Sequence, residues 1–218
     1  MCPGKPGFFL ASATMTPIHF QRQFDSRSLT DGLSGTYWVR SEDGSLSLRA
    51  ATHGRGTAGD TVFVDARSGV PQFAVHPKRK LLNTKYDVLD SQGHVIGRLQ
   101  HHLGSERPYW SLLDEQGNER AGIVQPDAIL KQFLQHTIHG AREAYAFAVG
   151  QATFATLTEE TAPRQFVRGL KRFLHALLKP RAWVLRLEPD NIANLDPRVV
   201  IAGALMMQEL TVAPAVAD

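Results

Sequence analysis

The sequence predicts a mainly β protein of the α+β class, in which a closed antiparallel β-barrel surrounds an apolar helix near the carboxyl end of the chain. Two observations lead to this prediction. Acidic turns with glycine recur between Thr36 and Gln125, and they separate short apolar strands. The segment 198–210 is apolar on nearly every side of a helix, so it needs cover on every side. A sheet that closes on itself supplies that cover and removes its own edges.

Length and composition favour one globular domain. A chain of 218 residues with 43% apolar residues is long enough to bury a substantial core. We expect a single barrel domain over 21–214, with a flexible tail at 1–20 and a short tail at 215–218. The net charge of +3 is modest and does not by itself indicate nucleic-acid binding.

Cysteine usage indicates the compartment. Cys2 is the only cysteine, which excludes an internal disulfide and a cysteine-rich zinc site. Stability must therefore come from packing. This usage fits a reducing compartment, so we expect a cytoplasmic protein.

The first residues imitate an export signal, because Lys5 precedes the apolar run 8–10 and the small residues Ala11 and Ala13. That run is far shorter than the ~7 to 15 apolar residues that a signal peptide needs. We interpret the segment as a loose tail, or as the result of a start codon assigned too early, with Met15 as the alternative beginning.

Four hairpins are predicted in the first half of the chain. Their turns lie at 42–44, 65–69, 90–93 and 114–117, and each contains an aspartate and a glycine. Aspartate starts such a turn by bonding its own backbone, and glycine supplies the positive φ that closes it. Apolar residues alternate along the flanking segments, which is typical of strands with one buried face.

The second half of the chain mixes helices and strands. Pro126 to His139 follows helical spacing, with proline suited to the first helical position. A strand pair is expected over 143–160, a second helix over 164–179, and a strand over 182–189.

The last element is the apolar helix, which Asp196 can cap and Pro197 can begin. Its thirteen residues, 198–210, span about 20 Å, whereas a bilayer core is about 30 Å thick and needs ~20 apolar residues. The helix is too short to span a membrane. The small residues at 202–204 would let strands approach closely, so we infer a barrel threaded by this helix.

Hairpins of the form "KYDVLDSQGHVIGRLQ", a late strand "AWVLRLEP" and a terminal apolar helix after an acidic residue resemble the tubby C-terminal-like superfamily. Within it, the chain is similar to the LURP-one-related and phospholipid-scramblase-like branch over about 36–212. The resemblance implies about twelve strands around a central helix. It also implies an association with membranes and phosphoinositides, which recurs in the superfamily.

The sequence departs from the superfamily in two places. The superfamily's C-terminal signature and its phosphoinositide-binding Lys/Arg strand cannot be located in this sequence, so no lipid-binding residue is carried over. The acidic calcium-binding segment of scramblases is represented only by "EPDNIANLD", in which Asp190 and Asp196 are too few and wrongly spaced.

The clearest candidate binding feature is a basic amphipathic helix over 164–179. At about 100° per residue, apolar side chains fill one arc of this helix. The opposite arc carries Arg164, Arg168, Lys171, Arg172, His175 and Lys179. A helix that merely covers a barrel usually mixes both signs of charge, so the uniform sign favours anionic lipid or an acidic partner. An ordinary covering helix remains an alternative, and nucleic acid is the weakest one.

A second basic cluster contains Lys78, Arg79 and Lys80 in "HPKRK". We interpret it as a solvated loop, which would form one patch with the basic helix if the two lie side by side.

Other motifs do not support catalysis. Glycines at 54, 56 and 59 have dinucleotide-site spacing, but a strand follows them where the site needs a helix. His136 and His139 have no third metal ligand, and His101 and His102 point to opposite faces of a strand. No hydrolase, metalloprotease or P-loop motif occurs, so we expect no catalytic residue, metal or cofactor.

The preferred hypothesis is a non-catalytic module that binds anionic phospholipid or phosphoinositide headgroups. The alternative is a regulatory module that docks on an acidic protein partner. Scramblase activity is the least supported hypothesis, because the only candidate spanning segment is too short.

Overall fold

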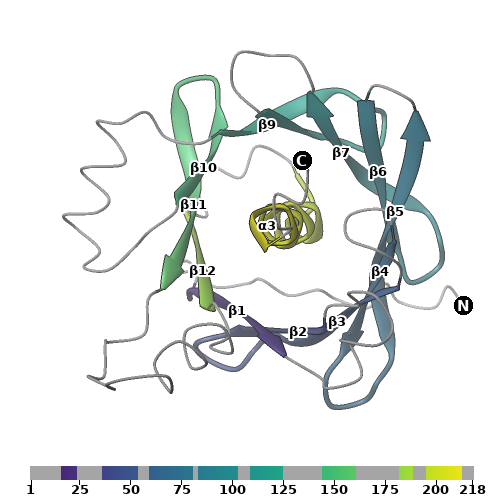
Figure 1. Cartoon of the computed structure of the whole chain (residues 1–218), viewed down its shortest axis with the longest axis vertical. Coiled ribbons are helices and arrows are strands. Elements are labelled where there is room, and N and C mark those ends of the chain that lie inside the picture. Colours follow the sequence, from purple (N-terminus) through teal and green to yellow (C-terminus); the bar gives the residue numbers. More distant parts are fainter. Residues whose placement is uncertain are drawn as a thin grey trace, which may run out of the picture.

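The structure, a computed structural model, describes residues 16–23, 36–53, 59–80, 83–102, 109–124, 144–160, 182–188 and 195–212. Within these ranges, twelve antiparallel strands form a closed barrel around helix α3 (Pro197–Val212), which confirms the predicted architecture (Figure 1). The strands are β1 (Ile18–Gln23), β2 (Thr36–Ser41), β3 (Ser47–His53), β4 (Asp60–Asp65), β5 (Pro71–Lys80), β6 (Asn83–Asp90), β7 (Val95–His102), β8 (Tyr109–Leu113), β9 (Glu119–Val124), β10 (Ala144–Val149), β11 (Ala152–Glu160) and β12 (Ala182–Leu187). Strands adjacent in sequence pair with each other, and β1 closes the ring by pairing with β12.

The four predicted hairpin turns are confirmed. They connect β2 to β3, β4 to β5, β6 to β7, and β8 to β9. The glycine of each turn has a positive φ: 71° at Gly44, 72° at Gly69, 86° at Gly93 and 91° at Gly117. Side chains with a Cβ rarely adopt this backbone region, which explains why each turn contains glycine.

Asp114 shows how an aspartate organises one of these turns. Its carboxylate accepts hydrogen bonds from the backbone N–H of Asn118 and from Nε of Arg120, both at 2.8 Å. Desolvation raises the pKa of Asp114, but the hydrogen bonds from Asn118 and Arg120 outweigh it and lower the pKa to about 2. The carboxylate therefore stays charged, and remains an acceptor, at neutral and mildly acidic pH.

The start of α3 has the predicted cap. Oδ1 of Asp196 accepts a hydrogen bond of 2.9 Å from the backbone N–H of Arg198, and the Asp196 carbonyl accepts one from Val199. Pro197, which has no N–H to satisfy, occupies the first helical position. These contacts satisfy backbone donors that a helix start leaves unpaired.

Helix α3 fills the middle of the barrel. Every side chain from Val199 to Met207 is buried, and α3 packs against β6, β7 and β8. Nε2 of the buried Gln208 donates a hydrogen bond of 3.3 Å to the Ala204 carbonyl. The apolar circumference of the helix is thus enclosed by protein, as the sequence predicted.

Two glycines allow the close packing of α3. A Cβ added at Gly203 would lie 3.0 Å from Cδ1 of Ile123, so the expected close approach at the small residues is confirmed at this position. On the barrel wall, a Cβ at Gly97 would lie 2.5 Å from Cγ2 of Val199. The strand therefore contributes as much to this fit as the helix does.

Strand β1 begins inside the segment 1–20 that we expected to be a flexible tail. Ile18 and Phe20 are buried and belong to the core. They pair with Leu185 and Trp183 of β12. The barrel domain therefore begins before residue 21.

Strands β10 and β11 confirm the expected strand pair, and β12 confirms the late strand. The two expected helices at 126–139 and 164–179 lie outside the described residues.

Candidate binding groove

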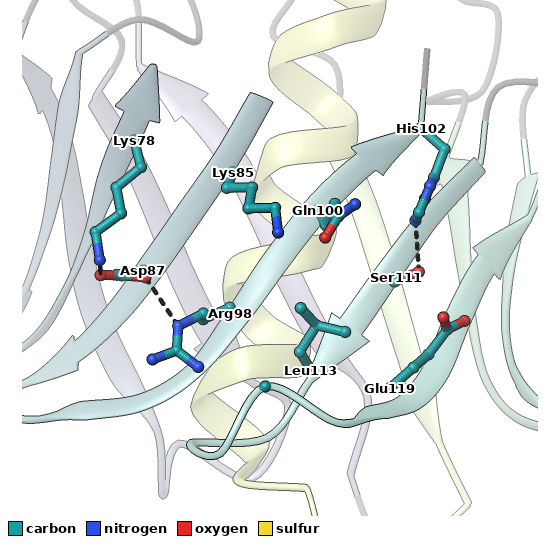
Figure 2. Close-up of a pocket in the computed structure, with 10 residues that line it drawn as sticks. Lys78, Lys85, Asp87, Arg98, Gln100, His102, Ser111, Leu113 and Glu119 are labelled. Carbon is teal, nitrogen blue, oxygen red and sulfur yellow. Dashed lines mark hydrogen bonds and ion pairs between the residues drawn. The ribbon is translucent and has the colours of Figure 1, made fainter. Parts of the chain in front are cut away.

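The outward positions of neighbouring strands form a groove on the outer face of the barrel. Along β6, Tyr86 and Val88 belong to the core, and the alternation of a strand points Lys85 and Asp87 the other way. Figure 2 shows these side chains on the side of the sheet opposite α3. The groove has a volume of about 490 Å³, within the usual range of ligand sites. It is lined by Lys78, Lys85, Asp87, Arg98, Gln100, His102, Ser111, Leu113, Gly117 and Glu119.

Asp87 holds two of the cations in place. The residue is 5% exposed, and its carboxylate forms ion pairs with Lys78 of β5 and with Nε of Arg98 on β7, the latter at 3.2 Å (Figure 2). Nη1 of Arg98 also donates a hydrogen bond of 3.0 Å to the Glu115 carbonyl in the β8–β9 turn. The guanidinium is thus fixed in position before any ligand arrives.

Replacing Asp87 with Asn should lower the free energy of unfolding by about 1–2 kcal/mol, because it leaves Arg98 and Lys78 without a charged partner. Urea denaturation measures this change in the free energy of unfolding. Asp60→Asn is the matched control, since Asp60 pairs with His76 and both side chains are about half exposed. The control should cost less than about 0.5 kcal/mol. Equal losses in the two variants would contradict a special role for Asp87.

Lys85 differs from its basic neighbours because, among the described residues, it forms no ion pair. Its side chain is half-buried, and its ammonium extends across the groove toward Gln100 of β7 (Figure 2). A charge without a partner in a concave surface attracts an anionic ligand group. Lys85 is therefore the strongest candidate anion contact in the groove.

The two adjacent histidines of β7 point to opposite faces, as predicted. The ring of His101 stacks on Trp110, with centroids 4.7 Å apart, and burial together with the nearby charge of His102 lowers the pKa of His101. Nε2 of His102 lies 2.8 Å from Oγ of Ser111 on the groove side. Ser111 is 1% exposed, so its hydroxyl orients the imidazole at the groove wall.

Of the basic residues singled out in the sequence, Lys78 lies in the groove. The interpretation of Lys78, Arg79 and Lys80 as a loop is wrong, because all three belong to β5, whose pairing with β6 continues to Lys80 and Asn83. Pairing with β6 extends β5 through these three basic residues. The side chains of Arg79 and Lys80 lie outside the described part of the structure.

The basic residues of the expected helix, at 164, 168, 171, 172, 175 and 179, lie outside the described residues, as do His136 and His139. Whether the expected basic helix flanks Lys78 therefore stays a prediction.

Sequence reasoning missed Lys85, Asp87, Arg98 and Glu119 as groove residues. Their signal was present, since these charged residues occupy the polar positions of alternating strands. Alternation alone cannot show which of several strands are neighbours. The register pairs Asp87 with Arg98 across β6 and β7, and this brings their charges together.

In the described part of the chain, no group of three or more His, Cys, Asp or Glu side chains could hold a metal ion. No helix there has both the length and the apolar character needed to cross a membrane.

Comparison of the chain with protein-family models, with curated proteins and with solved structures finds no match.

Proposed function

We propose that this chain is a tubby-like, non-catalytic module that binds anionic lipid headgroups at a membrane surface. The observation that carries the proposal is the groove on the outer barrel face, where Lys85 has no ion-pair partner among the described residues and lies beside the fixed Arg98. The tubby-like assignment is supported by the closed twelve-strand barrel around an apolar helix.

Because α3 fills the barrel centre, we expect a ligand to bind on the outer surface. Because α3 is buried from Val199 to Met207, the described interior is occupied by the chain's own side chains. A polar headgroup is better matched by the outer groove, which offers ammonium, guanidinium and amide donors from Lys85, Arg98 and Gln100.

The charge of the expected basic helix adds to this surface. Each basic side chain near anionic lipid contributes about 1 kcal/mol of binding, so the five permanent cations of 164–179 would give weak, salt-dependent attachment. The basic helix would hold the protein close to the membrane, and the groove would then bind a headgroup.

Flotation with phosphatidylcholine vesicles that contain rising fractions of phosphatidylglycerol tests the proposal. We expect binding to grow with the anionic fraction and to weaken as salt is added. Replacing Arg168, Lys171 and Arg172 together with Glu should abolish flotation and leave the β-barrel circular-dichroism spectrum unchanged.

The contribution of the groove is tested with a separate variant in the same flotation assay. Lys85→Glu should reduce vesicle affinity by roughly tenfold or more, since it removes one attraction and adds a repulsion. Arg67→Glu makes the same change of charge at an exposed turn outside the groove and should have a smaller effect. Binding that ignores both lipid charge and ionic strength would count against the proposal. A detergent-resistant protein complex without flotation would favour an acidic protein partner.

A further inference from the structure

A tryptophan and two arginines face outward on β2 and β3. Tyr37 and Val39 belong to the core, so the alternation of β2 points Trp38 away from α3. The register places Trp38 directly opposite Arg49 of β3, and Cζ of Arg40 lies 4.4 Å from the centroid of the Trp38 ring. Both arginines are exposed, and among the described residues neither forms an ion pair. These three residues, which we call the Trp38 surface, combine an aromatic ring with uncompensated positive charge.

The Trp38 surface and Lys85 lie toward the same end of the barrel. Trp38 and Lys85 are each the third residue of their strands, β2 and β6. The four ladders that connect β2 to β6 are antiparallel, so these two strands run in the same direction. We call the end at which both strands begin the Trp38 end. Figure 2 shows Lys85 and Gln100 nearer to this end than Arg98.

The basic residues of 164–179 are attached to the barrel at the same end. Through β1, the register connects Trp38 to Ala182, the first residue of β12. Glu160, the last residue of β11, lies opposite Ala182 and forms an ion pair with Arg186. Both described flanks of this basic segment therefore lie at the Trp38 end.

The opposite end of the barrel is acidic in the turns that the structure describes. These turns follow β2, β4, β6 and β8, all of which run toward this end. The segments 41–46, 65–70, 90–94 and 114–119 together contain seven carboxylates and one arginine. A hydrogen bond from the Ser41 hydroxyl holds the pKa of Asp43 well below its usual range, so this carboxylate is charged at neutral pH. An anionic surface would repel this end.

We propose that the barrel docks end-on against an anionic membrane, with the Trp38 end facing the lipid and the aspartate turns facing away. Figure 1 shows β2 and β6 on different sides of the barrel, so a flat bilayer reaches both Trp38 and Lys85 only at the end that they share. An indole ring favours the interface between headgroups and water, and the arginines beside it attract lipid phosphate. This inference rests on the proposed function and deepens it, since it adds a second contact surface and fixes the orientation.

Tryptophan fluorescence tests the inference, because Trp38 is the only one of the three tryptophans that is not buried: Trp110 is 3% exposed and Trp183 is 1% exposed. The probe is a vesicle of phosphatidylcholine and phosphatidylglycerol in equal parts, in which the phosphatidylcholine carries bromine on its acyl chains close to the headgroup. Bromine quenches a nearby indole, so we expect these vesicles to quench the wild-type chain more than unbrominated vesicles do. Trp38→Phe should still float with the vesicles and should lose most of this quenching.

Charge reversal on the Trp38 surface gives a second measurement. Arg49→Glu should weaken binding to the phosphatidylglycerol vesicles by roughly tenfold, since it removes one attraction and adds one repulsion. Arg67→Glu makes the same change at the acidic end and should alter vesicle affinity by less than about twofold, because that end faces away from the lipid. Both side chains are exposed, so circular dichroism should show an unchanged fold for both variants.

Several outcomes would overturn end-on docking and leave the proposed function standing. These are flotation without bromine quenching, quenching that survives Trp38→Phe, and equal losses of affinity from Arg49→Glu and Arg67→Glu. Absence of flotation with every anionic vesicle would overturn the proposed function, and the inference with it.

Discussion

Replacing Val200 with Asp is expected to prevent the barrel from folding. Val200 lies on α3, is 0% exposed, and belongs to the cluster of buried apolar side chains that forms the core. An unpaired carboxylate there must either stay charged in an apolar medium or become protonated, and both cost more than about 4 kcal/mol. That is close to the whole stability of a typical domain. Circular dichroism and the solubility of the expressed variant measure the outcome.

The same chemical change at an exposed valine is the control. Val70 follows the β4–β5 turn and is 53% exposed, so Val70→Asp should change the free energy of unfolding by less than about 0.5 kcal/mol. A folded, soluble Val200→Asp protein with wild-type stability would show that α3 is not enclosed. The closed barrel and every site inferred from it would then have to be abandoned.

Replacing Gly97 with Ala is expected to destabilise the protein by about 3 kcal/mol, at the upper end of overpacking effects. The new methyl group would lie 2.5 Å from Cγ2 of Val199 and 2.9 Å from the carbonyl oxygen of Leu113. The first neighbour is a stiff, buried β-branched side chain, and the second is backbone of the adjacent strand. Neither can move away cheaply, so α3 and the wall must separate. Urea denaturation gives the difference.

Gly203→Ala provides the comparison from the helix side. Its new methyl group would meet Cδ1 of Ile123 at 3.0 Å and Cδ2 of Leu112 at 3.3 Å, and both atoms are side-chain ends. Alanine also favours a helix over glycine by about 1 kcal/mol, which offsets the crowding. We expect stability within about 1 kcal/mol of the wild type.

The double variant Gly97→Ala with Val199→Ala separates the two contacts at Gly97. It should recover part of the loss, because the side-chain contact is relieved while the contact with the Leu113 carbonyl remains. If Gly97→Ala alone proves neutral, the close approach of β7 and α3 is disproved.

The turns and the central helix could be predicted because their causes are local. An aspartate followed by a glycine stabilises a tight turn wherever it occurs, as the positive φ values at Gly44, Gly69, Gly93 and Gly117 confirm. The burial of α3 also followed from its own composition, since a helix without a polar face has to be covered.

Strand β1 was not predicted because its cause is distant. Its alternation of Ile18 and Phe20 with polar residues is short, and it is stabilised by β12, more than 150 residues later in the chain. The run from Lys78 to Lys80 was assigned to a loop for a similar reason, since only its pairing with β6 extends β5 through it. Charge runs favour exposure, but exposure does not exclude a strand.

The sequence by itself determined that this chain turns four times at aspartate–glycine pairs and encloses an apolar helix that begins after Asp196. Only the tertiary structure decided that Lys85, Asp87, Arg98 and Glu119 share one groove. The physical reason is that turn geometry and helix burial depend on neighbouring residues in the chain. A groove on a barrel wall depends instead on the order and register in which separate strands pair.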